Sequence, residues 1–408
     1  MLASKNSVAA VDGCDGGDPA GCARAAQRVV VVRATAAQAS HTRGATLGTI
    51  HLRMRATLPL ARLSRRSLAE YYATVIGRPT PAIFVILLAI CPALLAFQAP
   101  ARPKRPGVAE PSVRIPMTRL KPDEVFEIPG VPDWIAIDDH VWVSNSPKHT
   151  VTRIDPKANK IVETIPVGKN PCSGLAAGFG SLWVPNCGDP SLSRVDLKTG
   201  KVSTTLPLTI ANSEGGLTIA AGSVWMMTDA KGSLARIDPA TNKVVAEIYV
   251  AEGSFAVASG EGAVWITSTE KNLLTRVNPR NNLVEETITV GPRPRFLAVG
   301  EGSVWTVNQG DGTISRVDAA TNKVVATIEA GIPGPGGEIS IGEGSVWVTS
   351  FEYPITRIDP STNKVAQQFY GEGGDAIRVG HGSVWLSNLR QANVWRLDPK
   401  RILATLPE

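Results

Sequence analysis

One tryptophan-centred pattern recurs seven times in this 408-residue chain and constrains its fold more than any other feature. Each copy is a short run such as SVWTVN, and successive copies lie 38 to 42 residues apart. The seven tryptophans are Trp142, Trp183, Trp225, Trp265, Trp305, Trp347 and Trp385. Ten or eleven residues after each comes an arginine, then an aliphatic residue, then Asp or Asn. Such self-similarity at one period indicates a repeat architecture.

Each unit has the pattern of four short strands, as in 297–299, 304–307, 313–317 and 323–328. These segments are rich in Val, Ile, Thr and Trp, which favour strands. The second strand is apolar at successive positions, as expected of a strand buried on both faces. Seven such units predict an all-β, seven-bladed β-propeller with four antiparallel strands per blade. We place the blades near 133–166, 174–207, 216–250, 256–290, 296–330, 338–370 and 376–406.

Two segments compete to supply the outer strand of the last blade. Residues 124–128 (EVFEI) have a strand pattern ahead of the first unit, and residues 402–406 (ILATL) follow the third strand of the seventh. A propeller usually closes by combining strands from both ends of the chain, but this blade has one free position. We expect one segment to take the outer edge and the other to pair beside it or stay loose.

The net charge of +6 is confined to the N-terminal part of the chain. Residues 1–101 contain 11 basic and 4 acidic side chains, which leaves 31 basic and 32 acidic ones for residues 102–408. A nucleic-acid partner needs basic side chains on the folded domain. The propeller is nearly neutral, so we expect no nucleic-acid partner.

The basic excess surrounds a segment with the pattern of an export signal. Residues 82–97 (AIFVILLAICPALLAF) are apolar but shorter than the roughly 20 residues of a membrane span. Basic residues precede this run, and Ala99-Pro100-Ala101 offers a cleavage site before Arg102. We therefore expect periplasmic or extracellular localisation. The alternative is an uncleaved N-terminal anchor, with membrane contact only through residues 82–97.

These patterns divide the chain into four parts. Residues 1–53 are a disordered leader or the product of an upstream start, and residues 54–101 are the signal peptide or anchor. Residues 102–119 form a linker, and residues 120–408 form the propeller, which we expect to be monomeric.

Cys172 and Cys187 lie symmetrically about a turn centred on Phe179-Gly180 in the second unit. Opposed residues of an antiparallel hairpin lie within disulfide range, and an exported chain permits the bond. We predict a disulfide, with two free thiols and metal binding as the alternatives.

A ligand-binding rim is expected where loops before first strands and after second strands meet at the central channel. The polar residues chosen there are Asn145, Asn186, Asp229, Arg293, Arg295, Asn308, Glu338, Asp375 and Asn388. Asp133, Glu214 and Glu252 lie in the same group of loops. Such a rim suits a small polar molecule, a peptide or a protein partner. A hydrated funnel without a ligand is the alternative.

The repeat Arg-Ile-Asp-Pro-Ala-Thr-Asn-Lys-Val-Val-Ala (236–246), with its Gly-Glu-Gly-Ser-Val-Trp turns, resembles the YVTN family of propeller repeats. It is also similar to virginiamycin B lyase-like (streptogramin lyase) propellers. The second resemblance implies a C–O lyase that opens a cyclic depsipeptide with a divalent metal, Mg²⁺. It also implies Glu and His side chains just after the second-strand aromatic residue.

The chain departs from that pattern. The matching positions are Asn145, Thr228, Ser268, Asn308, Ser350 and Asn388, with no histidine among them. An elimination without a base of near-neutral pKa loses about two to four powers of ten in rate. We therefore expect a binding or scaffold module, with no certain cofactor. The alternative is a lyase that uses Mg²⁺ and a carboxylate base, Glu338 or Asp229; its catalytic residues remain unassigned.

Overall fold

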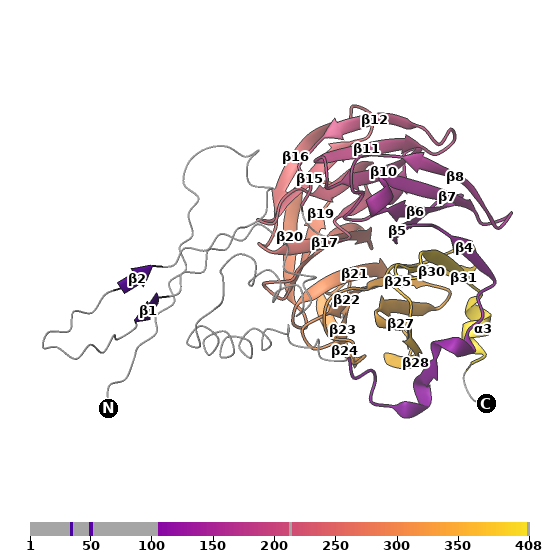
Figure 1. Cartoon of the computed structure of the whole chain (residues 1–408). Helices are drawn as coiled ribbons and strands as arrows, with labels where there is room; N and C mark the ends of the chain where they lie inside the picture. Colours follow the sequence, from indigo (N-terminus) through magenta and orange to yellow (C-terminus); the bar gives the residue numbers. More distant parts are fainter. Residues whose placement is uncertain (1–32, 36–48, 52–104, 212–213, 406–408) are drawn as a thin grey trace, which may run out of the picture. The chain divides into compact units, whose positions relative to one another are not determined.

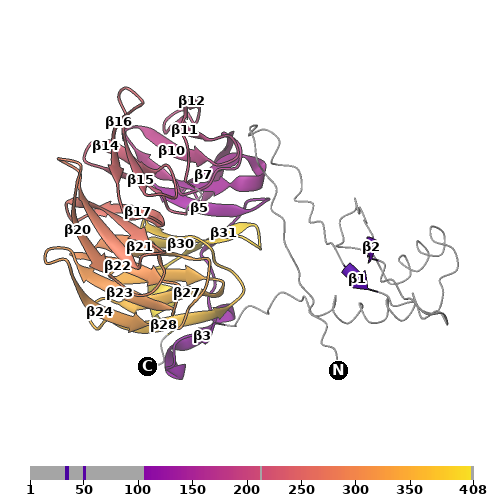
Figure 2. The same cartoon turned by 90° about the vertical axis from the view of Figure 1, so that its left-hand side faces the viewer.

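The computed structural model describes residues 33–35, 49–51, 105–211 and 214–405, and the last two ranges form a seven-bladed β-propeller. Figures 1 and 2 show the seven sheets arranged about a central axis. The first four strands of each blade pair antiparallel with their neighbours, and the first strand is innermost. This confirms the predicted fold class and strand number.

The strands follow the repeat. Blade 1 contains β5 (Pro132–Ile137), β6 (Val141–Asn145), β7 (Thr150–Asp155) and β8 (Lys160–Pro166). Blade 2 contains β9 (Ala176–Gly178), β10 (Ser181–Asn186), β11 (Ser191–Asp196) and β12 (Val202–Pro207). Blade 3 contains β13 (Leu217–Ala220), β14 (Ser223–Met227), β15 (Ser233–Asp238) and β16 (Lys243–Tyr249). Blade 4 contains β17 (Ser254–Gly260), β18 (Ala263–Ser268), β19 (Leu273–Asn278) and β20 (Leu283–Thr289). Blade 5 contains β21 (Pro294–Gly300), β22 (Ser303–Asn308), β23 (Thr313–Asp318) and β24 (Lys323–Glu329).

The last two blades also use the segment that precedes blade 1. Blade 6 contains β25 (Glu338–Gly342), β26 (Ser345–Ser350), β27 (Glu352–Asp359) and β28 (Lys364–Gly371), with β3 (Arg114–Pro116) parallel to β28 as a fifth strand. Blade 7 contains β29 (Ile377–Gly380), β30 (Ser383–Asn388) and β31 (Asn393–Leu397), completed by β4 (Glu124–Glu127). Figure 1 shows β4 beside β31. The N-terminal candidate therefore takes the outer edge.

The C-terminal candidate is not a strand, so the strand pattern assigned to residues 402–406 is wrong for the described residues there. Residues Pro399–Leu403 form helix α3 instead. Asp398 caps this helix by accepting a hydrogen bond from the Lys400 backbone N–H at 2.8 Å, and Pro399 occupies the first turn. Ile402 is fully buried against blade 6 and blade 7 residues. Once β4 fills the edge, a capped helical turn is the structure that still buries Ile402.

The repeated tryptophans and arginines join neighbouring blades. All seven tryptophans are fully buried. In six blades the repeated arginine lies over the tryptophan ring, with its Cζ 4.7 to 5.3 Å from the ring centroid. In five blades it also donates to a backbone carbonyl and to an Asn Oδ1 in the turn of the next blade; these arginines are Arg194, Arg236, Arg276, Arg316 and Arg396. The Arg-x-Asp repeat is thus an inter-blade connection.

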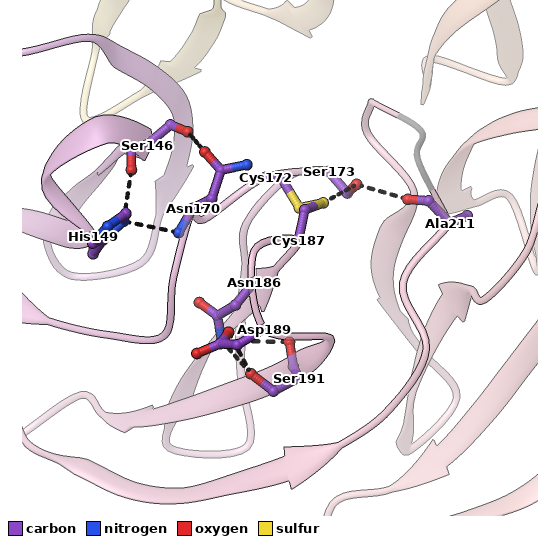
Figure 3. The surroundings of a disulfide bond; sticks show 10 residues. All are labelled: Ser146, His149, Asn170, Cys172, Ser173, Asn186, Cys187, Asp189, Ser191 and Ala211. Atoms are coloured by element: carbon purple, nitrogen blue, oxygen red, sulfur yellow. Dashed lines mark hydrogen bonds between the residues drawn. A yellow bond between two sulfur atoms is a disulfide. The ribbon is translucent and has the colours of Figure 1, made fainter. Parts of the chain in front are cut away.

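The structure contains the predicted disulfide between Cys172 and Cys187, whose Cα atoms are 5.9 Å apart. Figure 3 shows the bond beside Ser173, which donates to the Ala211 carbonyl of blade 3 at 3.2 Å. The bond fixes the loop before β9 to the end of β10. Both segments lie on the face of blade 2 where ligand loops were predicted.

In the N-terminal unit, residues 1–101, the described residues form a two-stranded antiparallel ladder of β1 (Arg33–Thr35) and β2 (Thr49–His51). The apolar run 82–97 and the cleavage site before Arg102 lie outside the described residues. No helix in the described part of the chain has the length and apolar character needed to cross a membrane.

Candidate functional site

A cavity of about 290 Å³ lies among loops of blades 1, 3, 5, 6 and 7, on the face where ligand loops were predicted. Its lining comprises Asp133, Trp134, Glu214, Arg295, Pro335, Gly336, Gly337, Glu338, Phe351, Asp375, Ala376 and Leu389. We call it the acidic cavity because four of these residues are carboxylic acids. A second cavity of about 300 Å³, lined by innermost strands, shares Glu338 with it. Glu338 therefore lies between the acidic cavity and the central channel.

Asp133 and Asp375, from blades 1 and 7, both line the acidic cavity, and each carboxyl affects the pKa of the other. Burial raises the pKa of Asp375 to about 6. Burial, and then the charge of Asp375, raise the pKa of Asp133 well above its ordinary value. Two carboxylates so close cannot both ionise easily, so the pair retains a proton to a higher pH than an isolated aspartate does.

Glu338 is the most deeply buried acid of the cavity, with 3% of its surface exposed. One carboxylate oxygen forms an ion pair with Arg378, and the other accepts a hydrogen bond from the Ile377 N–H at 3.0 Å. Burial raises the pKa of Glu338 to about 7 despite the opposing effect of Arg378. The carboxyl is thus held rigidly and titrates near neutrality.

Arg295 supplies the positive side of the cavity. Its Nη2 lies 2.6 Å from a carboxylate oxygen of Glu214, and its guanidinium carbon lies 4.3 Å from the Phe255 ring centroid. A wider hollow of about 680 Å³ adjoins this arginine and includes Arg293 and Glu270. Arg295 therefore separates the acidic cavity from a more open groove over blades 4 and 5.

Three of the nine rim residues chosen from sequence meet in the acidic cavity: Arg295, Glu338 and Asp375. Arg293 lies in the adjoining groove. Asp229 accepts hydrogen bonds from Lys231 and Ser233 of its own turn, which lower its pKa, so it does not have the properties of a base. The structure places it outside the residues that line the acidic cavity.

The four rim asparagines are buried and hold loops in place. Asn145 accepts a hydrogen bond from the Val131 N–H at 3.1 Å, and Asn388 accepts one from the Gly374 N–H at 2.9 Å. These two asparagines fix the backbone just before Asp133 and Asp375. Asn186 and Asn308 donate to hydroxyl groups within their own blades. Their contribution to the site is indirect.

The selection of polar rim residues passed over the apolar part of the site. Trp134 and Phe351 line the cavity together with the carboxyls, and the guanidinium carbon of Arg390 lies 5.0 Å from the Phe351 ring centroid. Phe351 directly follows β26, at the second-strand end where a ligand loop was expected. The sequence signal that could have identified Phe351 was its position in the repeat, directly after a predicted second strand.

The donor set of the cavity does not fit a resident Mg²⁺ ion, which prefers several free carboxylate oxygens. Glu338 and Glu214 are engaged by arginines, and burial raises the pKa of both aspartates, so they resist ionisation. Among the described residues, no three His, Cys, Asp or Glu side chains are grouped as metal ligands. Thr228, Ser268 and Ser350, at lyase-matching positions, bond to carbonyls of their own blades.

Comparison with known proteins places the chain by fold. No protein-family model matches it, and no curated protein does. A streptogramin B lyase structure is 19% identical, with a TM-score of 0.57, and the match covers 67% of this chain and 96% of that one. A catalytically inactive virginiamycin B lyase from Staphylococcus aureus with quinupristin is 17% identical, with a TM-score of 0.58 and coverages of 67% and 98%. Hydrazine synthase from Kuenenia stuttgartiensis is 14% identical, with a TM-score of 0.57 and coverages of 68% and 97%.

Proposed function

We propose that this propeller is a binding module that takes a small ligand with a protonated amine into the acidic cavity. The observation that carries the proposal is the Asp133–Asp375 pair, held in a cavity that also contains aromatic side chains. Above pH about 6 Asp375 is ionised, so the pair carries negative charge and attracts a cation. Trp134 and Phe351 offer the apolar and π surfaces that an alkyl or aromatic ammonium ion favours.

Binding a cation would also displace a proton from Asp375. An ammonium group stabilises the ionised carboxylate of Asp375, which lowers its pKa and releases a proton to solvent when the pH is near or below about 6. Affinity should therefore rise as the pH increases through about 6, the pKa of Asp375. A neutral ligand of the same shape should lack this dependence.

Calorimetry on the purified full-length chain tests the proposal with phenethylammonium as the probe. We expect saturable binding, with a heat that varies with the ionisation enthalpy of the buffer because a proton is released. The neutral analogue 2-phenylethanol should bind at least about tenfold more weakly. The variant Asp375→Asn should lose the buffer dependence. Equal affinities for the two probes would contradict the proposal.

A second candidate function, depsipeptide ring opening, is favoured by one observation. The pKa of Glu338, raised to about 7, suits a general base near neutral pH. Two solved structures of similar fold are streptogramin lyases. Incubation with quinupristin followed by chromatography tests this candidate. A linear product that the variant Glu338→Gln fails to form would favour the lyase over the binding module.

We also propose that the chain is exported. The apolar run 82–97, its basic flank and the small residues before Arg102 support this, and so does the Cys172–Cys187 bond, since disulfides persist in oxidising compartments. Cell fractionation with N-terminal sequencing tests it. A new N-terminus near Arg102 in a secreted or periplasmic fraction is expected; a cytoplasmic chain would contradict export.

A further inference from the structure

The wall of the acidic cavity on blade 6 is built from two loops. The first is the loop before β25, residues 330–337, which contributes Pro335, Gly336 and Gly337 to the lining. The second is the connection after β26, which contributes Phe351. Gly334, Gly336 and Gly337 all have φ between 90° and 100°. A backbone so rich in glycine is not fixed by its own conformational preferences, so outside contacts must hold it.

Those contacts come from residues 105–108, which we call the strap. The Arg105 guanidinium donates to three backbone carbonyls, those of Pro333 at 2.7 Å, of Phe351 at 2.5 Å and of Pro335. One side chain therefore ties together both loops that form the blade 6 wall. The residues it joins are more than 220 positions away in the sequence.

The rest of the strap is bonded to the same blade. The Gly107 N–H donates to the Gly331 carbonyl at 2.9 Å, and the Val108 N–H donates to the Gln368 side chain at 2.7 Å. The fit at Gly331 is close, because a Cβ there would lie 1.9 Å from the Gly107 carbonyl oxygen. Gln368 is fully buried and also donates to the Ala330 carbonyl at 2.8 Å. The strap is thus a built part of the fold.

We propose that Arg105 is a positioning residue for the acidic cavity: the strap completes its blade 6 wall and keeps the site closed to bulk water on that side. The consequence for ligand affinity rests on the proposed function, but the effect on the wall does not. Because the strap begins three residues after the predicted cleavage point, it would remain in the processed chain.

The test compares full-length Arg105→Ala with a matched control, Arg119→Ala, which removes an exposed arginine from the same N-terminal segment. Hydrogen exchange of residues 330–337 should become about tenfold faster in Arg105→Ala, and the same loop should be unchanged in the control. The conservative variant Arg105→Lys should give an intermediate rate, because an ammonium group cannot reach three carbonyls at once.

A second measurement separates positioning from general stability. Carboxyl-carbon NMR should show the pKa of Asp375 shifted from about 6 toward its ordinary value in Arg105→Ala, because water would enter the opened cavity. The guanidinium bonds of Arg105 to Pro333, Phe351 and Pro335 end on backbone carbonyls of the wall, so a loss of stability elsewhere in the propeller would leave this titration unchanged.

Phenethylammonium affinity, measured on the same variants, should fall about five- to tenfold in Arg105→Ala. If the probe binds neither variant nor the parent chain, the proposed function fails while exchange and NMR still decide the role of the strap. Exchange rates and an Asp375 pKa equal to those of the parent chain would overturn the positioning role.

Discussion

At the scale of single residues, the site depends on carboxyl groups whose environments resist ionisation. Asp133 and Asp375 come from opposite sides of the closure between blades 1 and 7, and buried asparagines fix the loops that carry them. A folded-state pKa above the unfolded value means that the protonated pair favours the folded state. The part of that contribution due to Asp375 is complete below pH about 4 and is lost as the pH rises through about 6.

The variant Asp375→Asn should therefore gain stability relative to the parent chain as the pH rises. Near pH 4 the two proteins should unfold at similar temperatures, and above pH about 6 the variant should be more stable, because it no longer ionises next to Asp133. Thermal unfolding across this range measures the difference. A constant difference at all pH values would show that the pair is not the source.

The arginine of the repeat makes a second residue-scale prediction. Arg236 lies 5.2 Å over the Trp225 ring and donates at 2.9 Å to both the Pro279 carbonyl and Asn282 of the next blade. Its replacement by Ala should cost about 2–3 kcal/mol in unfolding free energy. The exposed Arg280 is the control, with an expected change under about 0.5 kcal/mol. Equal losses measured by denaturant unfolding would contradict the inter-blade role.

At the scale of elements, closure depends on β4. Phe126 is buried in this strand, with its ring centroid 5.8 Å from that of Trp385, whereas Val125 points outward with 37% exposure. Replacing Phe126 with Ala should cost about 3–5 kcal/mol. Val125→Ala in the same strand should cost little. Denaturant unfolding measures both, and a small loss for Phe126→Ala would mean that β4 does not close the ring.

The sequence patterns predicted repeated elements better than single ones. The seven blades could be predicted because every unit buries a tryptophan, such as Trp142, at the same place. The tryptophans therefore recur at a nearly constant spacing in the sequence. The C-terminal helix could not be predicted in this way, because Ile402 fits a strand as well as a helical turn. Only the pairing of β4 with the edge of blade 7 decides between the two. Strand β3 was also missed, since three residues carry too weak a pattern to predict pairing.

The part of the site that could be predicted was the part whose position follows directly from the fold. The rule for ligand loops led to Arg295, Glu338 and Asp375, because loop position follows from strand order. It also selected asparagines that satisfy buried backbone groups, since the sequence does not distinguish an inward-facing amide from one facing a cavity. Arg105 was unpredictable for a further reason: its partners are brought near it only by the closed ring.

At the scale of the whole molecule, one closed ring of blades places residues from both ends of the propeller around a single acidic cavity. Asp133 follows the strap and β4 in sequence, Asp375 lies just before the first strand of blade 7, and Arg105 joins the two loops of the blade 6 wall. The seven-fold repeat makes the propeller rigid, and the loops and strand ends that depart from the repeat carry the side chains that line the acidic cavity. A small cationic ligand is the kind of molecule this arrangement suits.

The most direct test of that account is the number of protons released when phenethylammonium binds the full-length chain, obtained from calorimetry in buffers of different ionisation enthalpy. We predict release of about half a proton near pH 6, where Asp375 is half protonated, falling toward zero well above the pKa of Asp375 and absent in Asp375→Asn. Binding without proton release at any pH, or no binding at all, would contradict it.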